Sequence, residues 1–166
     1  MNEVVLITGA AGGIGQAICE RLIARGMRLA LLDIDAARLQ ALAERLGEQA
    51  CAFALDLTDQ AALSGVLAQI EARFGRLDIL INNAAVAHVQ AFDERSVESI
   101  VSELNINLIA PLVLTRLAIP LLRRSADARV ISTVSLGGIF PLPETPIYAA
   151  SKFGLRGAMP VSYTHL

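Results

Sequence analysis

Thr8-Gly-Ala-Ala-Gly-Gly-Ile-Gly15 decides the fold, because it follows a short apolar run, Val4–Thr8, and opens an amphipathic segment. In such a stretch Gly9 permits a tight turn, Gly13 lets the backbone approach a ligand, and Gly15 lets the helix pack closely on the strand. The helix N-terminus then offers unpaired N–H groups to an anion such as a pyrophosphate. A glycine-rich loop alone is weak evidence, since turns and helix ends also use glycine. The strand–turn–helix context makes a dinucleotide-binding loop the favoured interpretation.

Short apolar runs alternate with longer amphipathic segments along the rest of the chain. The runs are rich in Val, Ile and Leu, as in strands covered on both faces; they are Val4–Thr8, Leu29–Leu32, Cys51–Leu55, Ile79–Ile81 and Val130–Val134. The segments between them have helical periodicity; they are Gly13–Arg25, Ala36–Leu46, Gln60–Phe74, Arg95–Glu103 and Leu108–Arg123. Short βα connections of this kind predict one Rossmann-like α/β domain, a doubly wound parallel sheet in three α/β/α layers.

Polar residues and glycines mark where these helices begin and end. The expected N-caps are Asp35, either Thr58 or Asp59, and Thr145 before Pro146, which places a further helix just before Tyr148. The expected helix stops are Gly26, Gly47 and Gly75.

Composition argues against several classes of partner. Of the 166 residues, 54% are hydrophobic and 18% are charged, which is typical of a globular domain with a sizeable core. Fourteen basic and sixteen acidic residues give a net charge of −2, so no basic patch is expected to bind nucleic acid or an anionic membrane. Aromatic residues make up only 4%, which also argues against base stacking.

Targeting, membrane and metal signals are weak. The first apolar run begins at Val4 with no basic region or cleavage site, so we expect a cytoplasmic protein. The stretch Leu108–Leu122 is interrupted by two prolines and an arginine, and is predicted to be too short to span a bilayer. Cys19 and Cys51 have neither metal-ligand spacing nor a disulfide framework, so buried thiols and no metal site are expected.

Tyr148 and Lys152 are four residues apart, so they share one face if the segment is helical, and Ser135 precedes Tyr148 by 13 residues. A phenol keeps its proton up to about pH 10 in water, but a nearby cation favours the phenolate. The pair therefore predicts a general acid/base, with Ser135 as a hydrogen-bond donor to a carbonyl. On their own, such Tyr/Lys pairs also arise on solvated helix faces.

Four further polar residues follow predicted strands or join helices, and each has two interpretations. Asp33 can accept bonds from a ribose 2′-OH and repel a 2′-phosphate, or cap a helix, and the first favours NAD over NADP. Asp56 can contact an adenine amino group or cap the next helix. Asn82 can bond backbone between strands or contact a cofactor, and Asn107 can hold open a backbone carbonyl for water or end a turn. His88 is interpreted as a surface histidine.

Taken together, these residues resemble the short-chain dehydrogenase/reductase family from Val4 to about Gly157. The resemblance rests on the glycine pattern Thr-Gly-x-x-x-Gly-x-Gly, followed in order and at family spacing by Asn82-Asn83-Ala84, Asn107, Ser135, Tyr148 and Lys152. Most members have glycine after Asn-Asn-Ala, where this chain has Ala85. This mild departure removes some backbone freedom next to the nicotinamide.

The resemblance implies an NAD-dependent oxidoreductase that interconverts a secondary alcohol and a ketone, or a related carbonyl, as a homodimer or homotetramer. Tyr148 would exchange a proton with the substrate oxygen, Lys152 would bind the nicotinamide ribose, Ser135 would polarise the carbonyl, and Asn107 would anchor a water of a proton relay. The expected cofactor-binding residues are Gly9, Gly12, Gly13, Ile14, Gly15, Asp33, Asp56, Leu57, Asn82, Ala84, Tyr148 and Lys152. A nicotinamide-binding module without turnover, or an inactive fragment, is the alternative.

The end of the chain departs from the family, whose members continue this helix and add two strands and a substrate loop. Pro160 is predicted to break the helix, because proline in a helix interior costs about 3 kcal/mol. We therefore expect residues 1–158 to form an incomplete catalytic domain and residues 159–166 to be a non-native or disordered tail. Without the next strand, Val130–Val134 would be an exposed apolar sheet edge, so low solubility and weak catalysis are expected.

Overall fold

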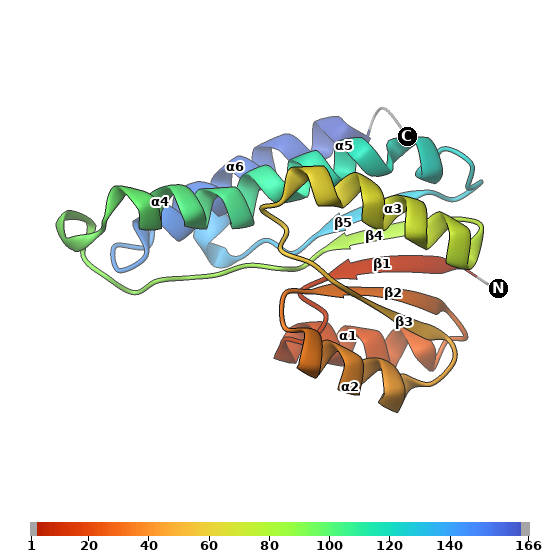
Figure 1. Cartoon of the computed structure of the whole chain (residues 1–166). Coiled ribbons are helices and arrows are strands. Elements are labelled where there is room, and N and C mark those ends of the chain that lie inside the picture. Colours follow the sequence, from red (N-terminus) through yellow and green to blue (C-terminus); the bar gives the residue numbers. More distant parts are fainter. Residues whose placement is uncertain (1–2, 164–166) are drawn as a thin grey trace.

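The computed structural model describes residues 3–163, with side chains up to residue 159, and has a parallel sheet between two helical layers (Figure 1). The strands are β1 (Val4–Thr8), β2 (Arg28–Asp33), β3 (Ala50–Ala54), β4 (Ile79–Asn82) and β5 (Arg129–Ser132). The α-helices are α1 (Gly13–Ile23), α2 (Ala36–Leu46), α3 (Gln60–Phe74), α4 (Val97–Leu104), α5 (Ala110–Leu122) and α6 (Pro146–Tyr163). Short helical turns are η1 (Phe92–Glu94), η2 (Asn105–Ile109) and η3 (Leu136–Gly138).

The five strands lie in the order β3-β2-β1-β4-β5, and every neighbouring pair is parallel. The chain builds outward from β1 to β3 and then crosses to the other side of β1 to form β4. The carboxyl ends of β1 and β4 therefore diverge into loops that run in opposite directions, which is where open α/β sheets bind ligands. This topology confirms the predicted Rossmann-like fold.

Alternate residues of the central strands supply two separate cores. Val5 and Ile7 of β1 face the layer of α1 and α2, whereas Val4 and Leu6 face the layer of α3 and α5. Figure 1 shows these two layers on opposite faces of the sheet. Strands buried on both faces explain the near-continuous apolar runs of the sequence.

Helices α2 and α3 have the predicted bounds, because each carries its own start and stop signal. The carboxylates of Asp35 and Asp59 accept hydrogen bonds from the N–H groups of Arg38 and Ala62, so Asp59 rather than Thr58 caps α3. Gly47 and Gly75 follow the last turns with positive φ. By contrast, α1 ends at Ile23, ahead of the predicted stop at Gly26.

Helices α4 and α5 are joined without a break by η2, a π-helical turn. The sequence predicted two separate segments here. The resulting 26-residue stretch, Val97–Leu122, is long and apolar enough to cross a membrane by length and composition. The sequence analysis considered only the shorter stretch Leu108–Leu122, because it did not anticipate that α4 and α5 are continuous. However, Leu114, Ala118 and Leu122 of its α5 portion are buried against the sheet and α3, as in the core helix of a globular domain.

The predicted helix break at Pro160 is also wrong, because the backbone of α6 remains helical to Tyr163. Proline removes one helical hydrogen bond and crowds the preceding turn, so it bends a helix without always ending it. Helix α5 similarly contains Pro120 close to its last turn. The status of residues 159–166 as a tail remains a prediction.

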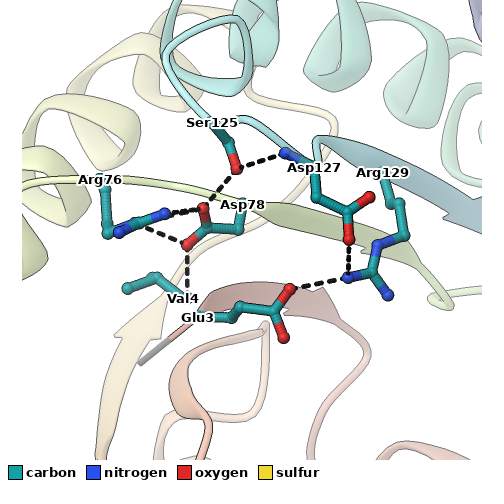
Figure 2. A network of polar contacts seen from close by, with 7 residues as sticks. All are labelled: Glu3, Val4, Arg76, Asp78, Ser125, Asp127 and Arg129. Atoms are coloured by element: carbon teal, nitrogen blue, oxygen red, sulfur yellow. Dashed lines mark hydrogen bonds and ion pairs between the residues drawn. The ribbon is translucent and has the colours of Figure 1, made fainter. Parts of the chain in front are cut away.

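The amino ends of β1, β4 and β5 are joined by a polar network around Asp78 (Figure 2). The buried Asp78 carboxylate accepts hydrogen bonds from Val4 N, the Arg76 guanidinium and Ser125 Oγ. Burial alone would raise the pKa of Asp78, but these hydrogen bonds together outweigh burial and hold the pKa below its ordinary value. The network fixes the edge of the sheet opposite to the carboxyl ends of the strands.

Within residues 3–163, strand β5 lies at the edge of the sheet and pairs with β4 alone. Its Ile131 side chain is 47% exposed, and Val134 just beyond the strand is also exposed. The predicted apolar sheet edge is therefore present, one or two residues earlier than expected.

Candidate functional site

A cleft of about 480 Å³ lies across the carboxyl ends of the strands, a size that suits a small molecule or cofactor. One half is formed by the ends of β2 and β3, and the other by the segments after β4 and β5 together with α6. The lining residues are Gly9, Gly12, Gly13, Ile14, Gly15, Asp33, Ile34, Leu55, Asp56, Leu57, Asn83, Ala84, Ala85, Val86, Ala87, Ile106, Thr133, Tyr148 and Lys152.

Gly9 and Gly15 are required by close backbone contacts in the β1–α1 loop. Gly9 has a φ of +65°, and a Cβ there would lie 2.8 Å from Ala84 Cα. A Cβ at Gly15 would lie 2.1 Å from Gly9 O. The loop therefore folds tightly against the start of α1 and against the segment that follows β4.

The N-terminus of α1 opens into the cleft with no side-chain cap. Its N-cap is Gly12, no acidic residue occupies its first turn, and Gly12, Gly13, Ile14 and Gly15 all line the cleft. The first N–H groups of a helix have no intrahelical partner, so they are available to an anionic ligand. These residues fit the phosphates of a dinucleotide.

Asp33 and Asp56 line the β2/β3 half of the cleft, with Leu57 beside them. Asp33 accepts hydrogen bonds from Ala11 N at 2.9 Å and Asp35 N at 3.1 Å, so it fastens the glycine-rich loop to the end of β2. Asp56 accepts from both the N–H and the hydroxyl of Thr58, each at 2.8 Å. Neither carboxylate caps a helix, since Asp35 and Asp59 do so.

The two asparagines after β4 have different surroundings. The buried Asn82 donates to Thr115 Oγ1 at 3.1 Å and does not line the main cleft. Asn83 does line it, and its Nδ2 donates to Thr8 O at 3.1 Å and Gly9 O at 3.2 Å. Thr8 Oγ1 accepts from the N–H groups of Asn83 and Ala84, both at 3.0 Å. The Asn82 amide is thus engaged by Thr115 of α5, while Asn83, Ala84 and Thr8 shape the cleft, and a contact of Asn82 with a cofactor stays a prediction.

Tyr148 and Lys152 both line the β4/β5 half of the cleft, one turn apart on α6. Lys152 is 2% exposed, its Nζ lies 5.6 Å from the centre of the Tyr148 ring, and Nζ donates to Thr133 O at 2.9 Å. Burial lowers the pKa of Lys152, because the charged form is poorly solvated. The phenol and the amine therefore reach the same cleft side by side, as acid/base chemistry at the tyrosine requires.

Ser135 lies beside the cleft and is not one of its lining residues. The side chain is half-buried, and its Oγ accepts a hydrogen bond from Gly137 N at 3.2 Å at the start of η3. Gly137 itself packs on the Tyr148 ring, where an added Cβ would lie 3.3 Å from two ring carbons. The Ser135 hydroxyl is thus bonded to Gly137, the residue that packs on the Tyr148 ring.

Asn107 is fully buried within η2 and holds the segment after β4. Its Oδ1 accepts from Val86 N at 2.8 Å, and its Nδ2 donates to Val86 O at 2.7 Å. The helix continues through Asn107, so this residue does not end a turn. Its π-helical setting interrupts the regular α-helical hydrogen-bond ladder at this point, as often occurs at functional sites.

Sequence reasoning missed Thr133, Thr8 and Asn83 as contributors to the cleft. A threonine directly before the glycine-rich loop was a usable signal for Thr8. The contact of Lys152 with Thr133 O involves a backbone carbonyl, which no side-chain pattern reveals. His88 is half-exposed as expected, but its ring contacts the buried Glu103, with 3.1 Å between Nδ1 and Oε2.

Comparisons with known proteins identify the family. A model of the short chain dehydrogenases matches residues 3–162. D-threitol dehydrogenase of Mycolicibacterium smegmatis is 34% identical, over 96% of this chain and 63% of that protein. Galactitol 2-dehydrogenase of Agrobacterium fabrum is 33% identical, over 95% of this chain and 62% of that protein. The chain thus spans less than two thirds of the length of these curated relatives.

Solved structures show the same fold and bind nicotinamide cofactors. A short chain dehydrogenase/reductase from Burkholderia phymatum in complex with NAD superimposes with a TM-score of 0.94 at 26% identity, over 99% of this chain and 60% of that one. A metagenomic short-chain oxidoreductase in complex with NADP gives a TM-score of 0.92 at 30% identity, over 98% of this chain and 77% of that one. The chain belongs to the short-chain dehydrogenase family of oxidoreductases.

Proposed function

We propose that this chain carries the cofactor-binding part and catalytic helix of an NAD-dependent oxidoreductase that interconverts a secondary alcohol and a ketone. The observation that carries the proposal is that Tyr148 and Lys152 line the same cleft as the glycine-rich loop and Asp33. A pyrophosphate would lie against the α1 N-terminus, between the two halves of the cleft.

The preference for NAD is supported by the charges of the β2/β3 half. Two carboxylates, Asp33 and Asp56, line this half. Among the described residues that line the cleft, Lys152 is the only cation, and it belongs to the other half. A 2′-phosphate beside Asp33 would therefore meet like charge without a compensating arginine, whereas a 2′-OH would find an acceptor.

The catalytic proposal assigns the proton steps to this chain's own side chains. When bound, the nicotinamide supplies the hydride chemistry. The Tyr148 hydroxyl exchanges a proton with the substrate oxygen, and the Lys152 cation, anchored on Thr133 O, stabilises the phenolate. Ser135 donates a hydrogen bond to the carbonyl oxygen, and Asn107 anchors a water of the relay that leads away from Lys152.

Polyols are the first substrates to test, because several relatives are named for them. D-threitol, galactitol and sorbitol dehydrogenases are 33–34% identical to this chain. We further infer a cytoplasmic protein that assembles as a homodimer or homotetramer through the α5 and α6 surfaces.

The test compares the wild-type chain with Tyr148→Phe in an NADH-binding titration and in a polyol oxidation assay with NAD. We expect weak but measurable turnover, a fall in turnover of about 10²-fold or more in the variant, and unchanged NADH binding. NADH binding with identical behaviour of both proteins in every assay would instead support a binding module. Absence of NADH binding to the wild-type chain would refute the proposal.

A further inference from the structure

A polar cluster made of Arg95, Glu103 and His88 lies outside the cleft and has no part in the proposed chemistry. Glu103 on α4 is fully buried, and its Oε2 accepts from Arg95 Nη2 at 2.8 Å and lies 3.1 Å from His88 Nδ1. Arg95 Nη2 also donates to Ser99 O at 3.1 Å. The Arg95 and Glu103 side chains are at most 1% exposed, whereas His88 is 52% exposed.

Stability alone does not explain this cluster. Glu103 Oε1 and Arg95 Nε are buried and find no hydrogen-bond partner within the part of the chain that the structure describes. A buried ion pair with unmet partners is seldom more stable than apolar side chains of the same size. Such a pair is better suited to fixing one particular arrangement of the segments that it joins.

The segments joined are helix α4 and the loop that follows β4. Glu103 and Asn107 are four residues apart on the continuous helix, and they hold His88 and Val86, which are two residues apart on the loop. The loop is therefore fastened to one side of the helix at two successive points. The cleft wall, Ala84–Ala87, contains the first of these points, Val86, and ends just before the second, His88.

We propose that the polar cluster positions the Ala84–Ala87 wall, so that His88 and Glu103 act as positioning residues for the half of the cleft that contains Tyr148 and Lys152. This inference rests on the proposed function, in which that half receives the nicotinamide end of the dinucleotide. The β2/β3 half is built by Asp33 and Asp56, which belong to separate segments, and it does not depend on the cluster.

The test compares the binding of NADH and ADP by calorimetry in the wild-type chain and in His88→Ala. This variant keeps the Arg95–Glu103 pair and therefore the fold. We expect NADH to bind about fivefold more weakly, because the wall of the nicotinamide half loses one of its two attachments to the helix, while ADP binding changes less than twofold. His88→Asn offers an amide donor in place of Nδ1 and is expected to restore NADH binding.

Gln90→Ala is the matched control, because Gln90 lies two residues further along the same loop and donates to Glu94 O rather than to α4. The control is expected to bind both nucleotides as the wild type does. Equal weakening of NADH and ADP in His88→Ala, or unchanged NADH binding, would overturn the proposal.

Hydrogen exchange of the Val86 amide tests the cluster without any ligand. We expect His88→Ala to exchange this amide at least threefold faster than the wild type and than Gln90→Ala, since one of two attachment points is lost. Unchanged exchange would overturn the positioning role. If the wild type bound neither nucleotide, the proposed function would fail, and the exchange rate would still decide whether the cluster holds the wall.

Discussion

Gly15→Ala probes the close packing that forms the glycine-rich loop, and its cost follows from the structure. The added Cβ would lie 2.1 Å from Gly9 O and 2.8 Å from Ala10 Cα. Both are backbone atoms, so neither can rotate away, and the loop or the helix must shift by about 1 Å to reach normal contact distances. Overpacking of this kind costs about 3 kcal/mol, and the helix propensity of alanine returns about 1 kcal/mol.

We therefore expect a net destabilisation of about 2 kcal/mol, which corresponds to a fall in Tm of about 4–8 °C for a domain of this size. Urea unfolding followed by circular dichroism measures the free energy of unfolding. Gly13→Ala is the matched control, because no atom lies within 4 Å of a Cβ at Gly13, which is exposed in the cleft. This control should keep or slightly increase stability, yet weaken NADH binding about tenfold by placing a methyl group where the phosphates approach. Equal stability of Gly15→Ala and wild type would refute the loop geometry.

Three further predictions concern ionisable residues. Asp78→Asn should lower the free energy of unfolding by about 2 kcal/mol at pH 7. Because hydrogen bonds lower the folded-state pKa of Asp78, the stabilisation by its carboxylate is present above about pH 4 and is lost as the pH falls through that pKa. Urea titrations at several pH values should show that the difference in unfolding free energy between wild type and Asp78→Asn becomes smaller in acid. A difference that stays constant with pH would contradict this. Lys152→Met should stabilise the ligand-free chain by about 1 kcal/mol and abolish turnover. Burial lowers the pKa of Lys152, so wild-type stability rises with pH between that pKa and about pH 10. The stability advantage of Lys152→Met over wild type should therefore shrink over this range, and an advantage that stayed constant would contradict the lowered pKa. Asp33→Ala should reduce the ratio of NADPH to NADH dissociation constants about tenfold, and calorimetry showing an unchanged ratio would remove Asp33 from cofactor selection.

The elements that could be predicted from the sequence are those whose signals are local. Helices α2 and α3 each combine an apolar stripe with an aspartate N-cap and a following glycine, and their bounds match the predictions. The apolar runs of β1, β2 and β4 are buried on both faces, so each of these strands could also be predicted from its own residues alone.

The parts that could not be predicted depend on contacts between distant segments. The π-helical turn η2 contains Asn107, whose side chain bonds the backbone of Val86, and no local pattern encodes this. In the same way, the sequence pattern predicts that Glu103 lies on the exposed face of an amphipathic helix, although the fold buries it against Arg95. The four-residue spacing correctly predicted that Tyr148 and Lys152 lie side by side, because one helix carries both. Ser135 lies outside the cleft because of the turn that follows β5, and the sequence pattern did not predict this turn.

The central claim is that one cleft binds a nicotinamide dinucleotide across both of its halves, and an NMR titration of the isotope-labelled chain with NADH tests it most directly. We expect the amide signals of Gly13, Asp33, Ala84 and Lys152 to shift together and to saturate with a single dissociation constant. Signals of the Asp78 network at the opposite edge of the sheet should stay in place. Shifts confined to one half of the cleft, shifts around Asp78, or no saturation at millimolar NADH would contradict the account.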